Sequence, residues 1–247
     1  MKLTIGWLYP DLMNTYGDRG NIIALTYRAR KRNINVMIKR ISLNNSPKEI
    51  DDCDLLFMGG AQDKQQEIVN NDLLKNKGKF LKEKIDDGAP GLYVCGAYQF
   101  LGKYYLTADS LKIIGLGIFD LYTKNPGLNY KRCIGDIIVK SDFLGGSFLV
   151  GFENHGGRTY LGKNILPFGK VLKGYGNNGE DKTEGAIYKN SIGTYLHGPI
   201  LPKNPELTDW LIKKALEKKY QKKIVLKKID NEIEKLAKNR FVGNLGG

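Results

Sequence analysis

A cysteine followed by glycine stands where an apolar run changes into a helix-like pattern, in the stretch GLYVCGAYQFLG of residues 91–102. A nucleophile on a sharp turn between a strand and a helix is presented at the edge of a sheet, and a small neighbour allows the strained turn. The N-terminus of a helix also favours the thiolate, which is the nucleophilic form of a cysteine. The full G-x-C-x-G pattern is not met, because Tyr93 and Ala97 occupy its outer positions. Since buried structural cysteines are common at strand ends, this stretch alone leaves both interpretations of Cys95 open.

A cysteine nucleophile needs a histidine base within hydrogen-bond reach. His197 follows the apolar run SIGTYL and precedes a Gly-Pro pair, and His155 follows FLVGFEN and precedes a Gly-Gly pair. Both histidines therefore stand at the end of an expected strand, and the residue types do not choose between them.

An acyl-transfer site also needs backbone N–H groups that stabilise an oxyanion. The N–H group of Gly96 lies next to the candidate nucleophile. The loop GGAQ, residues 59–62, is a second glycine-rich loop at a strand end. Without Cys95, this loop would be interpreted as an ordinary turn.

The elements that must position these residues have the rhythm of a doubly wound α/β sheet, in which function gathers at the carboxyl ends of the strands. The first half of the chain alternates β-branched or continuously apolar runs with patterns of helical spacing. After Leu111 the chain has short strands and glycine-rich turns, which we expect to extend the sheet or to pack beside it. A helix then begins after Asn204, with Pro205 in its first turn. The expected strands are LTIGWLYP, INVMIKRISL, CDLLFMGG and PGLYVC, and the later short ones are KIIGLGIFDLYT, RCIGDIIVKSD, FLVGFENHGG, GAIYKN and SIGTYLHG.

The composition is that of a globular protein with an excess of lysine. The chain has 247 residues and a formal net charge of +13. The sequence contains no apolar run of the roughly 20 residues that a membrane helix needs and no signal-peptide pattern, so we expect a cytoplasmic protein. The lysine-rich run LIKKALEKKYQKKIVLKKID lacks aromatic or recognition-helix patterns, which favours a solvated or partner-facing helix over a nucleic-acid surface.

Three cysteines without a C-x-x-C pair, together with two histidines, argue against a disulfide framework or a metal site, so Cys53 and Cys133 are expected to be structural.

Taken together, these segments resemble the class I glutamine amidotransferases of the cobyric-acid-synthase type. The resemblance is carried by DRGNIIALTYRARKRNI, GLYVCGAYQFLGK, VGFENHGGRTY, GYGNNGEDKTEG and GTYLHGPILPKNPELTD, and it weakens only in the C-terminal tail. It implies an α/β fold with a mostly parallel, doubly wound sheet flanked by helices, extra strands and a C-terminal helical tail. The implied amidotransferase domain covers residues 1–220. The charged helical tail covers residues 221–247, and its end is expected to be frayed.

The resemblance also implies residue roles. Cys95 would attack the side-chain amide of glutamine, and His197 would be the general base and acid, with His155 shaping the site. The backbone N–H groups of Gly60 and Gly96 would hold the oxyanion. The α-carboxylate of glutamine would bind to Arg132, whose guanidinium suits a carboxylate. Gln99, one helical turn after the nucleophile, faces the same way and would line the pocket or be solvated.

Within this family the chain is most similar to glutaminase subunits that form a heterodimer with a MurT-like Mur-ligase subunit. Such a partner would use ATP and Mg²⁺ to activate the D-glutamate carboxylate of lipid II, accept ammonia and form D-isoglutamine in peptidoglycan synthesis. No cofactor is expected in this chain, which has no G-x-x-x-x-G-K-[ST] motif. Lipid II would be reached through the partner, without membrane insertion.

One departure concerns the third member of a catalytic triad. Triad-type amidotransferases have a carboxylate two residues after the histidine, but this chain has Pro199 there. Because an imidazole must still be oriented, we expect the partner subunit to supply an acid, which would leave the isolated chain weakly active.

Two alternatives share parts of this pattern. A related amidotransferase could feed ammonia to a cobyrinate-type amidation through the same Cys95 and His197. A non-catalytic basic binding module would keep Cys95 only as a structural residue, and its thiol would not react with a glutamine-analogue electrophile.

Overall fold

The computed structural model describes residues 1–127 and 129–243. At its centre lies a six-stranded sheet, in the order β13-β14-β4-β3-β1-β2 within the described part of the chain. All pairs in this sheet are parallel except β13 with β14. The inner strands consist of continuous apolar residues, because both of their faces are covered. The strands are β1 (Lys2–Leu8), β2 (Asn35–Ile41), β3 (Leu55–Met58), β4 (Gly91–Val94), β13 (Ala186–Tyr188) and β14 (Ser191–Thr194).

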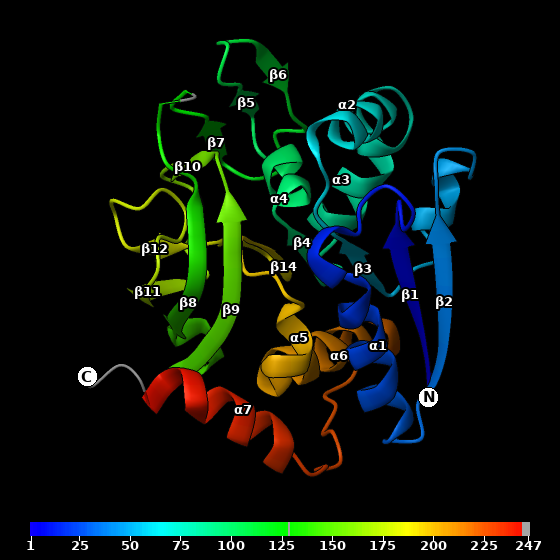
Figure 1. The fold of residues 1–247 in the computed structure, drawn as a ribbon. Helices are drawn as coiled ribbons and strands as arrows, with labels where there is room; N and C mark the ends of the chain where they lie inside the picture. The colour runs from blue at the N-terminus through cyan, green and yellow to red at the C-terminus, as the bar shows by residue number, and fades with distance from the viewer. Residues whose placement is uncertain (128, 244–247) are drawn as a thin grey trace.

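The chain order of the strands fixes which face of the sheet each helix covers. From β1 the chain passes through α1 (Arg19–Arg30) to β2 on one side, and from β3 it passes to β4 on the other side. Because both crossovers are right-handed, the intervening helices cover opposite faces. The second crossover contains α2 (Asp63–Asp72), a π-helical turn (Leu73–Lys77) and α3 (Gly78–Asp86). The predicted doubly wound α/β fold is therefore confirmed (Figure 1).

In the described part of the chain, two further four-stranded sheets lie beside the central one, and only part of them was expected. The expected strands RCIGDIIVKSD and FLVGFENHGG are found there, and KIIGLGIFDLYT is divided into two strands, whereas the strands at Tyr104–Leu106, Arg158–Leu161, Gly169–Lys173 and Thr183–Glu184 were not predicted. Figure 1 shows β8 and β9 standing alongside the central sheet, on the side away from β2. One sheet has the order β10-β7-β5-β6 and the other β12-β11-β8-β9. Their strands are β5 (Tyr104–Leu106), β6 (Lys112–Ile114), β7 (Leu121–Lys124), β8 (Cys133–Ser141), β9 (Ser147–His155), β10 (Arg158–Leu161), β11 (Gly169–Lys173) and β12 (Thr183–Glu184).

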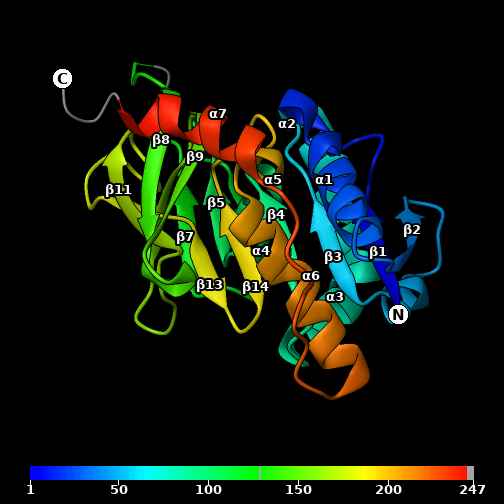
Figure 2. The ribbon, with the colours of Figure 1, turned by 90° about the horizontal axis from the view of Figure 1, so that it is seen from below.

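The C-terminal part packs against α1 and then crosses to the β8–β9 pair. The helices α5 (Ile200–Lys203) and α6 (Pro205–Tyr220) pack on α1, and α7 (Glu232–Val242) reaches β9 and α5 (Figures 1 and 2). The guanidinium of Arg28 in α1 forms two hydrogen bonds, of 2.7 and 2.8 Å, with Asp209 in α6.

The C-terminal tail becomes helical only at Glu232, whereas the sequence pattern predicts a helix from about residue 224. The sequence predicts fraying from Asn239 onward. In the structure α7 continues to Val242, and residues 244–247 lie outside the described part.

The predicted start of α6 is confirmed, but the role of its N-cap residue differs from a simple cap. Asn204 precedes Pro205 as expected, yet its side chain forms no capping hydrogen bond. Instead, its amide bonds both backbone groups of Val150 in β9, at 2.8 and 3.0 Å. Asn204 is fully buried and ties the start of α6 to the sheet that contains β9.

The core is continuous across the central sheet and its helices, and it includes large aromatic side chains such as Tyr93, Tyr98 and Tyr195. Among the described residues no helix is both long and apolar enough to cross a membrane.

One glycine in β14 shows how tightly this core is packed. A Cβ atom at Gly193 would lie 2.0 Å from Cδ2 of the buried Tyr98 ring, which has no room to move. We expect Gly193→Ala to lower the free energy of unfolding by about 1–3 kcal/mol, measured by urea denaturation. Gly243→Ala is the matched control, because a Cβ there meets no atom within 4 Å. Equal stability of the two variants would contradict this account of the β14 packing.

Candidate functional site

Cys95 is held in a strained turn at the carboxyl end of β4. Its backbone has φ 53° and ψ −107°, a conformation that non-glycine residues adopt only where the surroundings fix it. The Cys95 N–H group donates to the Thr194 carbonyl of β14 at 2.8 Å, and its carbonyl accepts from Gln99 in α4 (Gly96–Leu101) at 3.0 Å. The turn therefore has the geometry of the expected nucleophile elbow, although Tyr93 and Ala97 replace the outer glycines.

His197 lies at the same edge of the sheet, because β14 runs parallel to β4 with Thr194 opposite Val94. The two backbone groups of His197 pair with Phe152 of β9, through hydrogen bonds of 2.7 and 3.2 Å. Its side chain is fully buried. The position of this histidine is thus fixed by strands of two different sheets.

Gly60, which follows β3, lies between the cysteine and the histidine. A Cβ atom at Gly60 would lie 3.0 Å from Cε1 of His197 and 3.3 Å from Cβ of Cys95. A side chain at this position would therefore be tightly packed against both residues. The structure thus brings together three residues that follow three neighbouring parallel strands.

Asp18 completes this group, and the sequence reasoning missed it. The residue is fully buried and precedes α1, in the segment that follows β1. Its Oδ1 atom lies 3.8 Å from Nδ1 of His197, and its Oδ2 atom accepts the N–H of Gly60 at 2.6 Å. The signal that could have found Asp18 is its place after the strand next to β3, because the loops at one edge of a parallel sheet converge.

The surroundings of His197 favour its protonated form. Burial alone would lower the pKa of the imidazole, but Cys95 and the Asp18 carboxylate oppose that effect and raise the pKa to about 10. An imidazolium beside a cysteine favours the nucleophilic thiolate. His197 can therefore rest as an imidazolium at neutral pH, with a proton available for a leaving group.

The two predicted oxyanion donors differ in this structure. Gly96 opens α4, and the first N–H groups of a helix have no partner within the helix. The N–H group of Gly60, by contrast, donates to the Asp18 carboxylate. Gly60 can stabilise an oxyanion only when this bond is shared or released.

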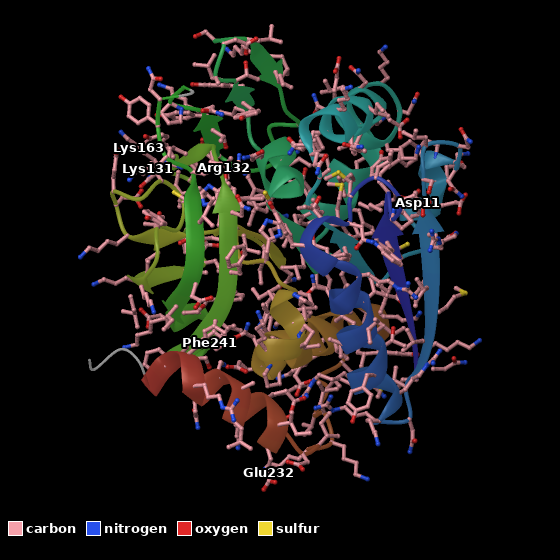
Figure 3. All side chains as sticks on the ribbon, in the orientation of Figure 1. Asp11, Lys131, Arg132, Lys163, Glu232 and Phe241 are labelled. Carbon is pink, nitrogen blue, oxygen red and sulfur yellow. The ribbon has the colours of Figure 1, made fainter. Side chains whose placement is uncertain are left out.

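The predicted substrate residues Arg132 and Gln99 line one cavity with Cys95 and His197. The cavity has a volume of about 500 Å³. Gln99 is 5% exposed, and its amide donates to the Tyr195 hydroxyl at 3.1 Å, so it is not a solvated helix residue. Arg132 immediately precedes β8 and is exposed at the rim (Figure 3).

His155 lies in the wall of the same cavity. Its ring stacks on Tyr195, with the ring centroids 3.7 Å apart, and its Nδ1 bonds the Gly157 carbonyl at 2.7 Å. Burial lowers the pKa of this imidazole. These contacts fit the expected shaping role, whereas His197 is the histidine beside Cys95 and Gly60.

Fold and site together are those of a glutamine amidotransferase. A match to the CobB/CobQ-like glutamine amidotransferase domain covers residues 4–205, and the chain therefore belongs to this family and is an enzyme of the amidotransferase class.

Two relatives match the chain over almost its whole length. The chain is 51% identical to the lipid II isoglutaminyl synthase (glutamine-hydrolyzing) subunit GatD of Staphylococcus aureus over 98% of this chain and 95% of that protein. The corresponding GatD subunit of Streptococcus pneumoniae is 43% identical over 91% of this chain and 85% of its own length. A probable cobyric acid synthase of Methanosphaera stadtmanae is 30% identical, but the match spans only 38% of that protein.

Solved structures support the fold. A crystal structure of a glutamine amidotransferase has a TM-score of 0.59 at 10% identity, covering 85% of this chain and 98% of that one. The structure of PurLQS from Thermotoga maritima has a TM-score of 0.56 at 15% identity, covering 90% of this chain and 100% of the matched chain.

The three thiols differ in a way that labelling can test. Burial raises the pKa of Cys53 to about 12 and that of Cys133 to about 11, so both stay protonated and unreactive near neutral pH. Cys95 lines the cavity beside a protonated histidine. We expect diazo-oxo-norleucine to add once, at Cys95, at pH 7, as measured by intact mass and peptide mapping. Labelling of Cys53 or Cys133 in the folded protein, or no labelling at all, would contradict this.

Proposed function

We propose that this chain is the glutaminase subunit of a lipid II isoglutaminyl synthase. The chain would hydrolyse L-glutamine and deliver ammonia to a MurT-like, ATP- and Mg²⁺-dependent partner that amidates D-glutamate of lipid II to D-isoglutamine. The observation that carries this proposal is the group of Cys95, His197 and Asp18, the first two of which line one cavity, in a chain that matches GatD subunits over 91% to 98% of its length.

The chemistry follows from the protonated His197 beside Cys95. The Cys95 thiolate attacks the side-chain carbonyl carbon of glutamine, and the Gly96 N–H at the start of α4 stabilises the oxyanion. The His197 imidazolium gives its proton to the departing nitrogen, so ammonia leaves and a thioester forms. The neutral imidazole then takes a proton from water, whose attack releases glutamate and restores the thiolate.

Asp18 takes the place of the missing carboxylate after His197. At 3.8 Å its Oδ1 atom is outside hydrogen-bond range of Nδ1, but it faces the imidazole in a water-poor site, where a carboxylate stabilises the imidazolium. The acid that the sequence assigned to the partner therefore has a counterpart within this chain.

The cobyrinate-type alternative has less support. The cobyric acid synthase match leaves more than half of that protein without a counterpart here, whereas the GatD matches span most of both chains. The non-catalytic binding module is wrong, because the chain belongs to an amidotransferase family.

The first test is glutamate release from L-glutamine by the chain with and without its partner subunit. We expect Cys95→Ala to abolish release, because Cys95 is the only cysteine among the described residues that line the cavity, and His197→Ala to reduce it by about 100-fold or more. Cys133→Ala is the matched control, since that thiol is buried away from the cavity. Glutamate release that survives Cys95→Ala would overturn the proposal. Replacing lipid II with a cobyrinate acceptor tests the alternative directly.

A second test concerns Asp18 and pH. Because catalysis needs the imidazolium, kcat/KM should fall as the pH rises through the pKa of His197, about 10. Cys95 and Asp18 both raise this pKa, and Asp18→Asn removes the Asp18 charge but keeps an oxygen for the Gly60 N–H. We expect the alkaline limb of the profile to move to lower pH and kcat to fall. An unmoved alkaline limb would show that Asp18 does not stabilise the imidazolium.

A further inference from the structure

Arg132 is an exposed residue, yet its guanidinium is held by two hydrogen bonds with Asn154. The Nε atom donates to Oδ1 of Asn154 at 3.0 Å, and Nη2 donates to the Asn154 carbonyl at 3.2 Å. Asn154 lies near the end of β9, opposite Ile134 of β8. Both bonds use the side of the guanidinium that faces β9, so N–H groups on Nη1 and Nη2 remain for a carboxylate.

The same asparagine continues the chain of contacts toward the catalytic histidine. Its Nδ2 atom donates to the hydroxyl of Tyr16 at 2.7 Å. The Tyr16 ring meets the His197 ring edge to face, with centroids 5.0 Å apart and planes at 74°. All four residues line the cavity. A continuous path of contacts therefore joins the expected carboxylate-binding arginine to the histidine that moves the proton.

Strand β9 serves as the common support of this path. Phe152 lies two residues before Asn154, so the two side chains share one face of the strand. The backbone of Phe152 pairs with that of His197, and its ring contacts Tyr16 with centroids 6.3 Å apart. One strand thus holds His197 through its backbone and Arg132 through an amide side chain.

Tyr16 has a conformation that ordinary packing does not explain. Its φ is 54°, in the left-handed region that costs a non-glycine residue free energy, and its side chain is 45% exposed. Burial of the ring therefore does not account for the strained backbone. Two contacts hold Tyr16 in this conformation: its hydroxyl accepts a hydrogen bond from Asn154, and its ring meets the His197 ring edge to face.

We infer that Asn154 and Tyr16 are positioning residues that hold the Arg132 guanidinium ready for the substrate α-carboxylate. Asn154 holds the guanidinium in its binding orientation before substrate arrives, which removes most of the ordering cost of a mobile surface arginine. Tyr16, whose ring packs against His197, accepts a hydrogen bond from Asn154 and so holds the Asn154 side chain in place. The contacts from Arg132 through Asn154 to Tyr16, called the bridge below, favour amides that carry a free α-carboxylate. This inference rests on the proposed glutaminase activity.

The test compares two substrates in the full chain with its partner subunit. Ammonia release is measured with L-glutamine and with L-glutaminamide, which has a neutral amide in place of the α-carboxylate. For Asn154→Ala we expect KM for glutamine to rise about tenfold, with kcat within about twofold of wild type. With glutaminamide, which cannot use the arginine, the variant and wild type should have the same kcat/KM.

Tyr16→Phe keeps the ring against His197 and removes only the hydroxyl. We expect a smaller rise in KM for glutamine and an unchanged alkaline limb of the pH profile. Because Tyr16 is partly exposed, this variant keeps the fold even if Asn154→Ala does not. Tyr175→Phe is the matched control, since Tyr175 is 47% exposed and does not line the cavity.

A double-variant cycle shows whether Asn154 acts through the arginine. Arg132→Lys keeps the positive charge but loses the planar group that Asn154 holds. In that background, Asn154→Ala should have no further effect on KM. Full additivity, or an equal loss with both substrates, would overturn the bridge and leave Asn154 with a merely structural role. No ammonia release by the wild-type complex would instead overturn the proposed function itself.

Discussion

The parallel pairing of four neighbouring strands is the constraint on which the site depends. β14, β4, β3 and β1 end at one edge of the central sheet, and each is followed by one member of the catalytic group. Four residues from distant parts of the sequence therefore meet without any long-range motif. The sheet that contains β9 fixes the position of His197 further, because the backbone of Phe152 in β9 pairs with that of His197. The order and direction of the strands thus determine the geometry of the catalytic group.

Much of this arrangement could be predicted from the sequence, because its signals are local. Continuous apolar runs bounded by glycine marked β3 and β4, and the strand–cysteine–glycine–helix pattern marked the strained turn at Cys95. The choice of His197 over His155 could not be made from residue types, since both follow apolar strands. It depends on which strand lies beside β4, and that is a property of the sheet order.

Other features could not be predicted, because they arise from contacts between distant segments. Asp18 looks like a polar residue before a helix, and only the folded sheet places it beside His197. Asn204 has the pattern of a helix cap, but the start of α6 is used to anchor β9. The later short strands carried too little periodicity to show that they divide into two separate sheets.

The strained backbone of Cys95 also bears on how this protein balances stability against activity. A side chain at φ 53° and ψ −107° costs free energy that a glycine would not, since glycine adopts positive φ freely. The nucleophile is therefore kept where the chain would be more stable without it. Stability alone would favour glycine at this position, whereas the chemistry of the site needs the thiol, so stability and activity make opposite demands on one residue.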